Sequence, residues 1–239
     1  MRNTARSGRF TKAQVRWLRQ PVNWPTPVVV SLDLDHFLHH TMEETMQKVF
    51  LDCGTNHFLG LKKMVVQSGV GLNWKIHTFE PNPEARSDLE AKTEDLRRKG
   101  FDLTYHPVAV GDSDGMVSFK YSNEEDKWGT TCSWHTGHLY QKEVQVPQID
   151  LAAFIRMHCV RADRIVCKMD IEGAEFHVLD HLLKTGVFEW LEELFVEWHV
   201  DNQWGHDWPA HFTEEQRTYY AQLKEQICNH PDVRVHEWD

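Results

Sequence analysis

The sequence predicts an α/β domain with a mostly parallel sheet, and three segments carry this prediction. Each is a short apolar run that ends in an acidic residue and a polar turn, before a stretch with helical spacing. They are KVFLDCGTNHFLG at 48–60, KIHTFEPNP at 75–83 and IVCKMDIEGAEFHVL at 165–179. In open α/β sheets, ligands bind at the carboxyl ends of the strands, near the unpaired N–H groups of the next helix. The acidic residues at these ends therefore predict a ligand site.

The first part of the chain is predicted to be a basic arm, residues 1–27, ahead of a single domain, residues 28–239. Six basic residues and no acidic residue precede Asp33, and the arm ends in the proline-rich PVNWPTP. The arm is expected to be a solvated tail or a short docked helix, with contact to an acidic partner as the alternative. Residues 34–48 then predict an amphipathic helix.

The first two strand ends suit a nucleoside. Glycine at position 54, between Asp52 and Asn56, allows a ligand to approach the backbone closely. Glu80 follows the second strand, where an acidic residue commonly binds ribose hydroxyls. The pattern G-x-G-x-x-G is absent, so a pyrophosphate has no glycine-rich site. A nucleoside without a pyrophosphate fits better, and a nicotinamide oxidoreductase is disfavoured.

The remaining regular elements complete the α/β pattern. Residues 84–99 predict a helix with a charged, solvated face, and a strand then leads to the turn AVGDSDG at 109–115. A helix at 214–229 and the strand VRVHEW at 233–238 close the chain.

Two insertions are expected in the domain, one or two hairpins at about 116–148 and a loop at about 200–213. Both are rich in tryptophan, with Trp128, Trp134 and Trp204 in predicted loops. Flat apolar rings on loops suit the C–H faces of a sugar, so these three residues are candidate substrate contacts. The alternative is that they fold back over the core of the protein.

Composition limits the class of protein. The chain has 239 residues, a net charge of −10 and no apolar run near the ~20 residues that span a bilayer. Outside the basic arm the charge is strongly acidic, which disfavours a nucleic-acid substrate. The five scattered cysteines include no CxxC pair, and they favour reduced thiols in a cytoplasmic protein.

Five motifs, in this order and spacing, resemble the FkbM-type S-adenosylmethionine-dependent methyltransferases: DCGTN, FEPNP, VAVGDSDG, KMDIEGAE and LFVEWH. The resemblance covers roughly residues 48–199. It implies a Rossmann-like class I methyltransferase fold with seven strands, a terminal antiparallel hairpin and helices on both faces. Members of the family methylate hydroxyl oxygens, often on sugars or natural products. One departure is Phe58, where such families usually have glycine, so Gly60 is expected to take its place.

The resemblance also implies the cofactor, S-adenosylmethionine, with S-adenosylhomocysteine as product. Ala109, Val110 and Asp112 are expected beside the adenine, although an ordinary loop residue is the alternative for Asp112. The full set of expected cofactor-binding residues is Asp52, Gly54, Asn56, Glu80, Asn82, Ala109, Val110, Asp112 and Asp170.

Methyl transfer to oxygen requires alignment of the acceptor hydroxyl and removal of its proton. Asp170 and His199 follow the fourth and fifth expected strands, and histidine, with an unperturbed pKa of about 6.5, is a competent base near neutral pH. Asp170 is expected near the methionine end of the cofactor or beside the substrate. Glu172 is a further catalytic candidate, and Lys168 is expected to pair with a carboxylate because buried lysines are rare otherwise. Glu172 and Glu175 are both expected in the first turn of the next helix, with helix capping as the simpler role for Glu175.

A metal-dependent variant remains open. Glu197 and His199 are two apart on a predicted strand and so point the same way, and Asp170 ends the neighbouring strand. Together they offer oxygen and nitrogen ligands for Mg²⁺ or Mn²⁺, which would lower the pKa of an acceptor hydroxyl. Hard cations more often bind carboxylates alone, which favours His199 as a base.

The sequence thus predicts an S-adenosylmethionine-dependent O-methyltransferase that acts on a sugar hydroxyl of a glycan or glycosylated metabolite. The alternative is a non-catalytic nucleoside-binding or assembly module that keeps the fold. No nucleic-acid partner and no membrane span are expected, and the oligomeric state is left open.

Overall fold

The computed structural model describes residues 46–122, 129–131, 141–199 and 212–238. All of them belong to the second of two units into which the chain divides, Met42–Asp239. The basic arm and most of the helix expected at 34–48 lie outside the described residues. Lys48, the last residue of that expected helix, instead begins the first strand. No helix among the described residues is long and apolar enough to cross a bilayer.

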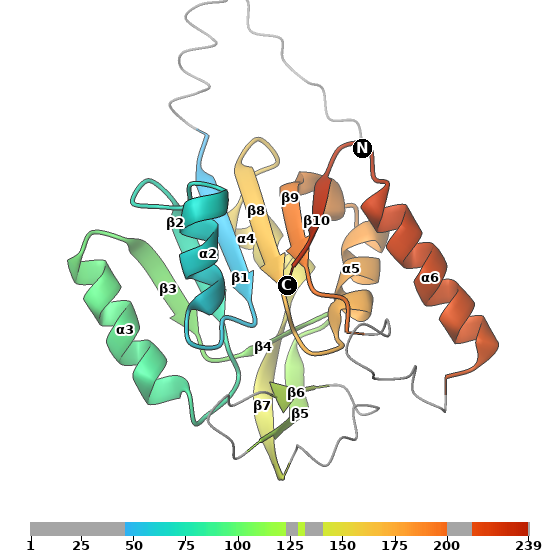
Figure 1. The fold of residues 1–239 in the computed structure, drawn as a ribbon, viewed down its shortest axis with the longest axis horizontal. Coiled ribbons are helices and arrows are strands. Elements are labelled where there is room, and N and C mark those ends of the chain that lie inside the picture. The colour runs from blue at the N-terminus through green and yellow to red at the C-terminus, as the bar shows by residue number, and fades with distance from the viewer. Residues whose placement is uncertain (1–45, 123–128, 132–140, 200–211, 239) are drawn as a thin grey trace, which may run out of the picture. The chain divides into compact units, whose positions relative to one another are not determined.

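A six-stranded sheet with the order β10-β9-β8-β1-β2-β3 forms the centre of the domain (Figure 1). All neighbouring strands in it are parallel. The order reverses between β1 and β8, so the first half of the chain extends the sheet one way and the second half the other way. Such a reversal is the usual ligand-binding place in open α/β sheets. The strands are β1 Lys48–Cys53, β2 Lys75–Phe79, β3 Asp102–His106, β8 Arg164–Met169, β9 Leu191–Val196 and β10 Arg234–Glu237.

Helices cover both faces of this sheet, as predicted. Alternate strand residues enter different cores because successive side chains of a strand point to opposite faces. Val49 and Leu51 pack in the core that includes α4, α5 and α6, whereas Phe50 packs with α2 and α3. The helices are α2 Leu59–Gln67, α3 Arg86–Arg98, α4 Leu151–His158, α5 Glu175–Lys184 and α6 Glu214–Cys228, with a short 3-10 helix η1 at Phe188–Trp190.

The expected terminal antiparallel hairpin is wrong, although the α/β fold class is confirmed. The last strand, β10, pairs with β9 in parallel, with Val235 opposite Leu194. The cause is α6, which follows β9 and carries the chain back before β10 begins. A helical crossover returns the chain in the same direction and gives a parallel pair, whereas a hairpin needs a short turn. The described part of this sheet also has six strands rather than the seven that the resemblance implies.

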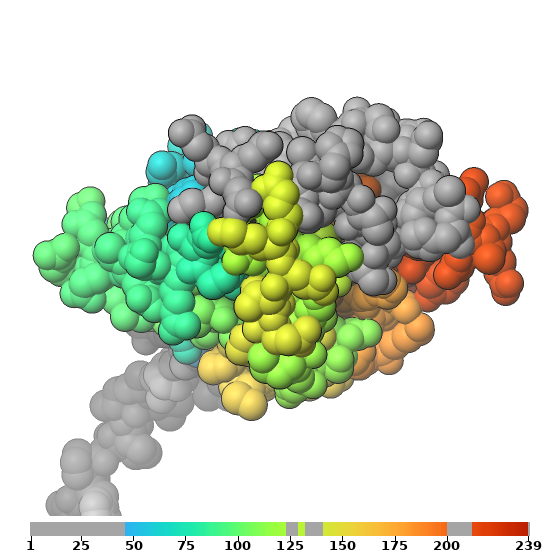
Figure 2. Space-filling model, turned by 90° about the horizontal axis from the view of Figure 1, so that it is seen from below, coloured from blue at the N-terminus to red at the C-terminus, as the bar shows by residue number. Residues whose placement is uncertain are grey.

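A second, smaller sheet lies beyond the carboxyl ends of the main strands, in the lower part of Figure 1. Its order is β4-β7-β5-β6, and β5 forms antiparallel pairs with β6 and β7 within the range of the predicted insertion. Seen from below in Figure 2, β5 and β7 occupy the middle of this face. Trp128, Trp134 and Trp204 lie outside the described residues, so their role stays a prediction. The strands are β4 Ala109–Gly111, β5 Gly115–Tyr121, β6 Gly129–Thr130 and β7 Lys142–Asp150.

Candidate functional site

Two strand ends meet where the sheet order reverses. Gly54 follows β1 with a φ of 75°, and a Cβ at this position would lie 1.7 Å from the carbonyl oxygen of Asp170, which follows β8. The Asp170 N–H donates a hydrogen bond of 3.1 Å to the carbonyl of Cys53. Glycine was predicted here to admit a ligand. The neighbour that requires it is the backbone of Asp170, so Gly54 joins two of the sequence motifs directly.

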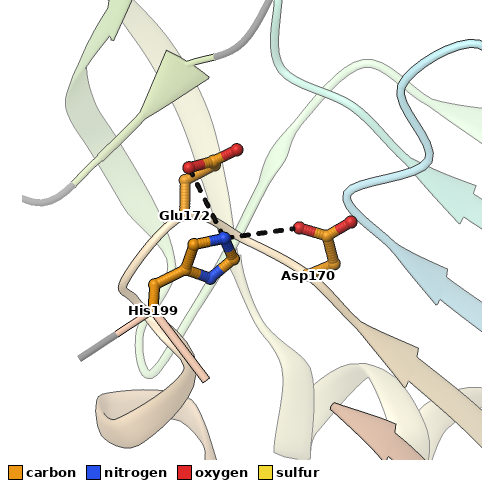
Figure 3. Close-up of side chains that lie close together, drawn as sticks. All are labelled: Asp170, Glu172 and His199. Atoms are coloured by element: carbon orange, nitrogen blue, oxygen red, sulfur yellow. Dashed lines mark ion pairs between the residues drawn. The ribbon is translucent and has the colours of Figure 1, made fainter. Parts of the chain in front are cut away.

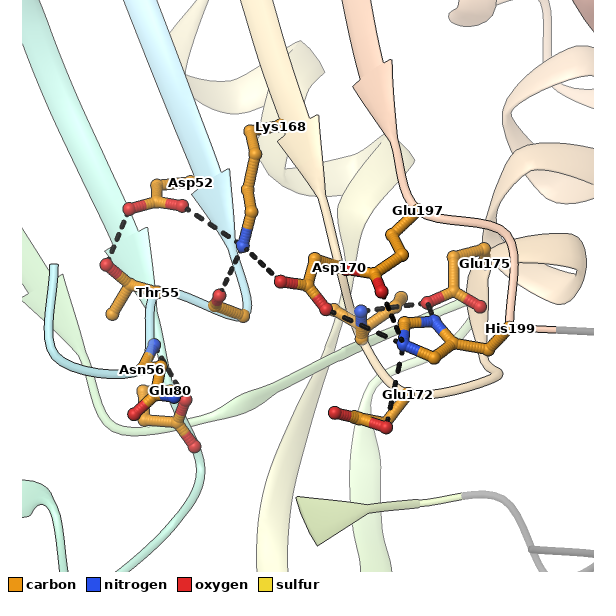
Figure 4. A network of polar contacts seen from close by, with 12 residues as sticks. Asp52, Thr55, Asn56, Glu80, Lys168, Asp170, Glu172, Glu175, Glu197 and His199 are labelled. Carbon is orange, nitrogen blue, oxygen red and sulfur yellow. Dashed lines mark hydrogen bonds and ion pairs between the residues drawn. The ribbon is translucent and has the colours of Figure 1, made fainter. Parts of the chain in front are cut away.

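Lys168 connects these strand ends through three oxygen atoms (Figure 4). Its side chain is 2% exposed, and Nζ lies 2.6 Å from the Gly54 carbonyl oxygen, 3.0 Å from Asp170 Oδ2 and 3.7 Å from Asp52 Oδ1. The predicted pairing of Lys168 with a carboxylate is thereby confirmed. Asp52 is fully buried and accepts a hydrogen bond of 2.5 Å from the Thr55 hydroxyl. We call Lys168, Asp52, Gly54 and Asp170 the Lys168 cluster.

The turn after β1 explains both the departure at Phe58 and the role of Gly60. Phe58 is buried and has a φ of 62°, the left-handed conformation that glycine adopts without cost. The backbone at Phe58 therefore has a conformation that favours glycine. Gly60 makes space instead, because a Cβ there would lie 2.9 Å from Asp52 Oδ1 and 3.3 Å from Lys168 Cε. It lets α2 lie directly over the Lys168 cluster.

Glu80 is held at the end of β2 by two backbone groups. Its oxygens accept hydrogen bonds of 3.1 Å from the Asn56 N–H and 3.0 Å from the Asn82 N–H. Burial raises the pKa of Glu80 to about 7, against the lowering effect of these two bonds. Asn82 is buried, and its Oδ1 accepts a bond of 3.0 Å from the Glu84 N–H. A carboxylate has about four lone-pair positions, so Glu80 keeps acceptor capacity for a ligand.

The three residues expected beside an adenine belong to the smaller sheet or its turn. Ala109 and Val110 are buried in β4, which pairs with β7. Asp112 follows β4 on the surface, and its Oδ1 accepts a hydrogen bond of 3.1 Å from the Ser113 hydroxyl. The local turn accounts for this contact of Asp112, so a ligand role for it stays a prediction.

His199 lies among four carboxylates, which together with it we call the His199 cluster: Asp170, Glu172, Glu175 and Glu197 (Figures 3 and 4). Glu175 Oε1 lies 2.9 Å from His199 Nδ1. The other ring nitrogen, Nε2, lies 3.8 Å from Asp170, 3.6 Å from Glu172 and 3.7 Å from Glu197. Burial alone would lower the pKa of His199, but the neighbouring carboxylates, Glu175 above all, raise it to about 10. The imidazole is therefore charged at neutral pH unless another cation approaches.

Two predictions about the position of these carboxylates are wrong. Glu172 does not lie in the first turn of a helix, since α5 begins at Glu175. Glu172 lies in the preceding turn with a φ of 55°, where Thr130 Oγ1 donates a 2.6 Å hydrogen bond to its carbonyl oxygen. Glu197 and His199 do not lie on a strand, because β9 ends at Val196. The carboxylate of Glu197 and the imidazole nevertheless approach each other at 3.7 Å.

Glu175 is the site residue that sequence reasoning undervalued. Its carboxylate is 0% exposed and accepts hydrogen bonds from the N–H groups of Ile171, 2.8 Å, and Gly173, 3.0 Å. These groups precede α5, so Glu175 fixes the turn that carries Asp170 and Glu172, rather than capping its own helix. The sequence did contain a signal for its burial. Glu175 stands three and four residues before the buried Val178 and Leu179, so all three share the apolar face of α5. A carboxylate on that face is seldom free of a specific partner.

The domain has relatives among known proteins. Residues 52–219 match the model of the methyltransferase FkbM domain. A solved structure, the methyltransferase FkbM from Methylobacillus flagellatus KT, is similar at 17% sequence identity and a TM-score of 0.37. That similarity covers 58% of this chain and 29% of the other, so this chain spans less than a third of its length. No curated protein matches. The domain match covers well over half of the sequence, and the chain belongs to the FkbM methyltransferase family.

Proposed function

We propose that the protein is an S-adenosylmethionine-dependent methyltransferase that methylates a hydroxyl oxygen, with a sugar of a glycan or glycosylated metabolite as acceptor. One observation carries the proposal: the Lys168 cluster and the His199 cluster share Asp170 at the place where the sheet order reverses. A ligand at this edge contacts residues of both clusters. The acceptor class rests on the tryptophan-rich insertions and on the tendency of the family.

The residues at this edge suit S-adenosylmethionine. Glu80, fixed by two N–H bonds, offers oxygens to the two ribose hydroxyls. The side chain of Asp170 is 26% exposed. Its carboxylate suits the ammonium group of the methionine part of the cofactor. Asp52 is fully buried beneath them and acts through Lys168 and Thr55. Bound S-adenosylmethionine supplies a methyl group that is electrophilic because it is attached to a positive sulfur.

His199 is the group placed to take the hydroxyl proton when no metal ion is present. Glu175 engages Nδ1, which leaves Nε2 as the ring nitrogen that can take a proton. A base must be neutral before it accepts a proton, and a nearby positive charge lowers the pKa of an imidazole. The charge of the bound cofactor therefore favours the neutral form. Nε2 of His199 would take the hydroxyl proton of the acceptor as the acceptor oxygen receives the methyl group that the cofactor would supply, and S-adenosylhomocysteine would be the product.

The alternative is a module that binds a nucleoside without turnover. The feature that favours this alternative is Phe58 in place of the glycine usual in the family, but Phe58 adopts a left-handed backbone conformation that glycine adopts without cost. This observation favours an intact cofactor turn. Binding and turnover, measured separately, distinguish the two functions.

The test is calorimetric titration with S-adenosylmethionine and S-adenosylhomocysteine. We expect micromolar binding by the wild type, a loss of at least about tenfold in Glu80→Gln, which is about 1.4 kcal/mol, and no change in the exposed control Glu90→Gln. Release of S-adenosylhomocysteine in the presence of sugar acceptors then establishes the enzyme. Absence of binding by folded wild-type protein would overturn the proposal, and binding without turnover on a broad acceptor panel would favour the module.

A further inference from the structure

Resting on the proposed methyl transfer, we propose that Asp170, Glu172 and His199 form a site for one divalent cation of the Mn²⁺ or Mg²⁺ class, with Glu197 as a further ligand. The site would hold two neighbouring oxygens of the acceptor. This set differs from the sequence prediction by the addition of Glu172.

The donor atoms already converge. One ligand atom from each of Asp170, Glu172 and His199 lies within 4.8 Å of the other two (Figure 3). His199 Nε2 is 3.6–3.8 Å from an oxygen of Glu172, Glu197 and Asp170. Among the described residues, none of these pairs is within hydrogen-bond distance. Adjacent ligands of an octahedral ion with bonds of about 2.1 Å are about 3 Å apart, so a contraction of less than about 1 Å would bring Nε2 and each of these oxygens to that separation.

The imidazole is held in the orientation that a ligand needs. The fully buried Glu175 engages Nδ1 at 2.9 Å, which leaves Nε2 for an ion. Glu175 is itself fixed by the N–H groups of Ile171 and Gly173. Histidines that bind metals almost always give their other nitrogen to a carboxylate or carbonyl in this way.

Charge balance supports a cation independently of the distances. Four carboxylates surround one imidazole, and Lys168 engages Asp170 through Oδ2, on the side away from His199. The side chain of His199 is 11% exposed, so water screens these charges poorly. Carboxylates gathered around one imidazole away from water are costly unless a cation balances them. A divalent ion would balance them.

The ligand chemistry indicates the kind of ion and of acceptor. Carboxylate oxygens with one imidazole suit Mn²⁺ and Mg²⁺ better than soft metals. The ion would bind two adjacent oxygens of the acceptor and lower the pKa of the hydroxyl to be methylated, whose proton then passes to solvent. The acceptor class would thus be a vicinal diol or another chelating pair of oxygens. His199 would serve as ligand and not as base.

The experiment is a titration of the full chain with Mn²⁺, followed by electron paramagnetic resonance, with and without S-adenosylhomocysteine. We expect one Mn²⁺ per chain with a Kd below about 100 μM. Asp170→Asn and Glu172→Gln should each weaken binding at least tenfold. The control Glu192→Gln, whose carboxylate pairs with Arg164 and Arg234, should bind as the wild type does.

The outcomes separate this inference from the proposed function. Wild-type protein that binds S-adenosylhomocysteine but no stoichiometric Mn²⁺ up to 1 mM, a range about tenfold above the expected Kd, would overturn the cation site and leave the methyltransferase intact. Binding that persists undiminished in both variants would place the ion elsewhere and also overturn the site. Circular dichroism would reveal a variant that fails to fold. In that case the wild-type titration alone still tests whether the chain binds one Mn²⁺.

Discussion

Two histidines of this domain are both largely buried but have opposite surroundings. His199 lies among carboxylates, which outweigh burial and raise its pKa to about 10. His77 of β2 is 3% exposed and packs among rings, and burial, followed by the charges of His106, His158 and Lys75, lowers its pKa to about 3. Burial acts in the same direction on both. The difference teaches that the sign of the neighbouring charge decides which histidine is protonated.

Four rings meet where α4 packs against the strands β2 and β3, and we call them the His77 group: His77, His106, Phe154 and His158. His77 Nδ1 is 3.0 Å from His106 Nε2, so one of the two rings donates and the other accepts. The rings of Phe154 and His158 pack against His77 with centroids 5.1 and 5.5 Å away. Nε2 of His77 is buried with no hydrogen-bond partner among the described residues. Burial therefore lowers the pKa of each of these histidines, and their protonation is unfavourable in the folded state.

The largest effect is expected from removal of the charge that orients His199. Glu175→Ala leaves the N–H groups of Ile171 and Gly173 without their acceptor and His199 without its partner. We expect the free energy of unfolding to fall by about 3 kcal/mol or more, measured by urea denaturation at pH 7. The exposed control Glu225→Ala should change it by less than about 0.5 kcal/mol. An equal effect of the two substitutions would remove the case for Glu175 as an anchor.

A smaller effect on the free energy of unfolding is expected when acid protonates the histidines of the His77 group. The folded pKa of His77 is below its unfolded value of about 6.5, so its neutral form contributes fully above that pH, and the contribution is lost as the pH falls toward about 3. The free energy of unfolding should fall by up to about 1.4 kcal/mol per pH unit for His77. We expect His77→Phe to show a shallower slope between pH 6.5 and 4.5 in urea denaturation, and Gln226→Ala to keep the wild-type slope. Parallel curves for all three proteins would contradict the assignment.

The smallest effect is expected on the pKa of His199, the histidine that lies among carboxylates. The raised pKa of His199 means that its ion pairing stabilises the fold fully below about pH 6.5 and is lost as the pH rises through about 10. Glu172→Gln removes one of its carboxylates while keeping the size of the side chain. We expect the pKa of His199 in metal-free protein to fall by up to about one unit, measured by NMR titration of its ring. A rise of that pKa would show that Glu172 does not act on it by charge.

The sequence was sufficient for the features that depend on local patterns. Apolar runs before Asp52, Glu80 and Asp170 correctly predicted three strands and the sheet edge at which they end. The helix predicted at 214–229 agrees with α6 to within one residue. Long-range contacts were not predictable in this way. The parallel pairing of β10 depends on where α6 packs, and the left-handed turn at Glu172 depends on Thr130 and Glu175. The role of Gly54 depends on the backbone of Asp170, which lies more than a hundred residues further along the chain.

The contact of Lys168 with Gly54 has a consequence for the order of folding. The two residues are 114 positions apart, and the segments 48–60 and 165–179 join only when β8 pairs with β1. A chain that emerges from the ribosome as far as residue 160 has Asp52 and the Gly54 turn but not the lysine that connects them. Contacts of such long sequence separation carry a loop-closure cost that local contacts do not. The ligand edge cannot form until β8 has been synthesised, and no N-terminal fragment that stops before β8 is expected to form it.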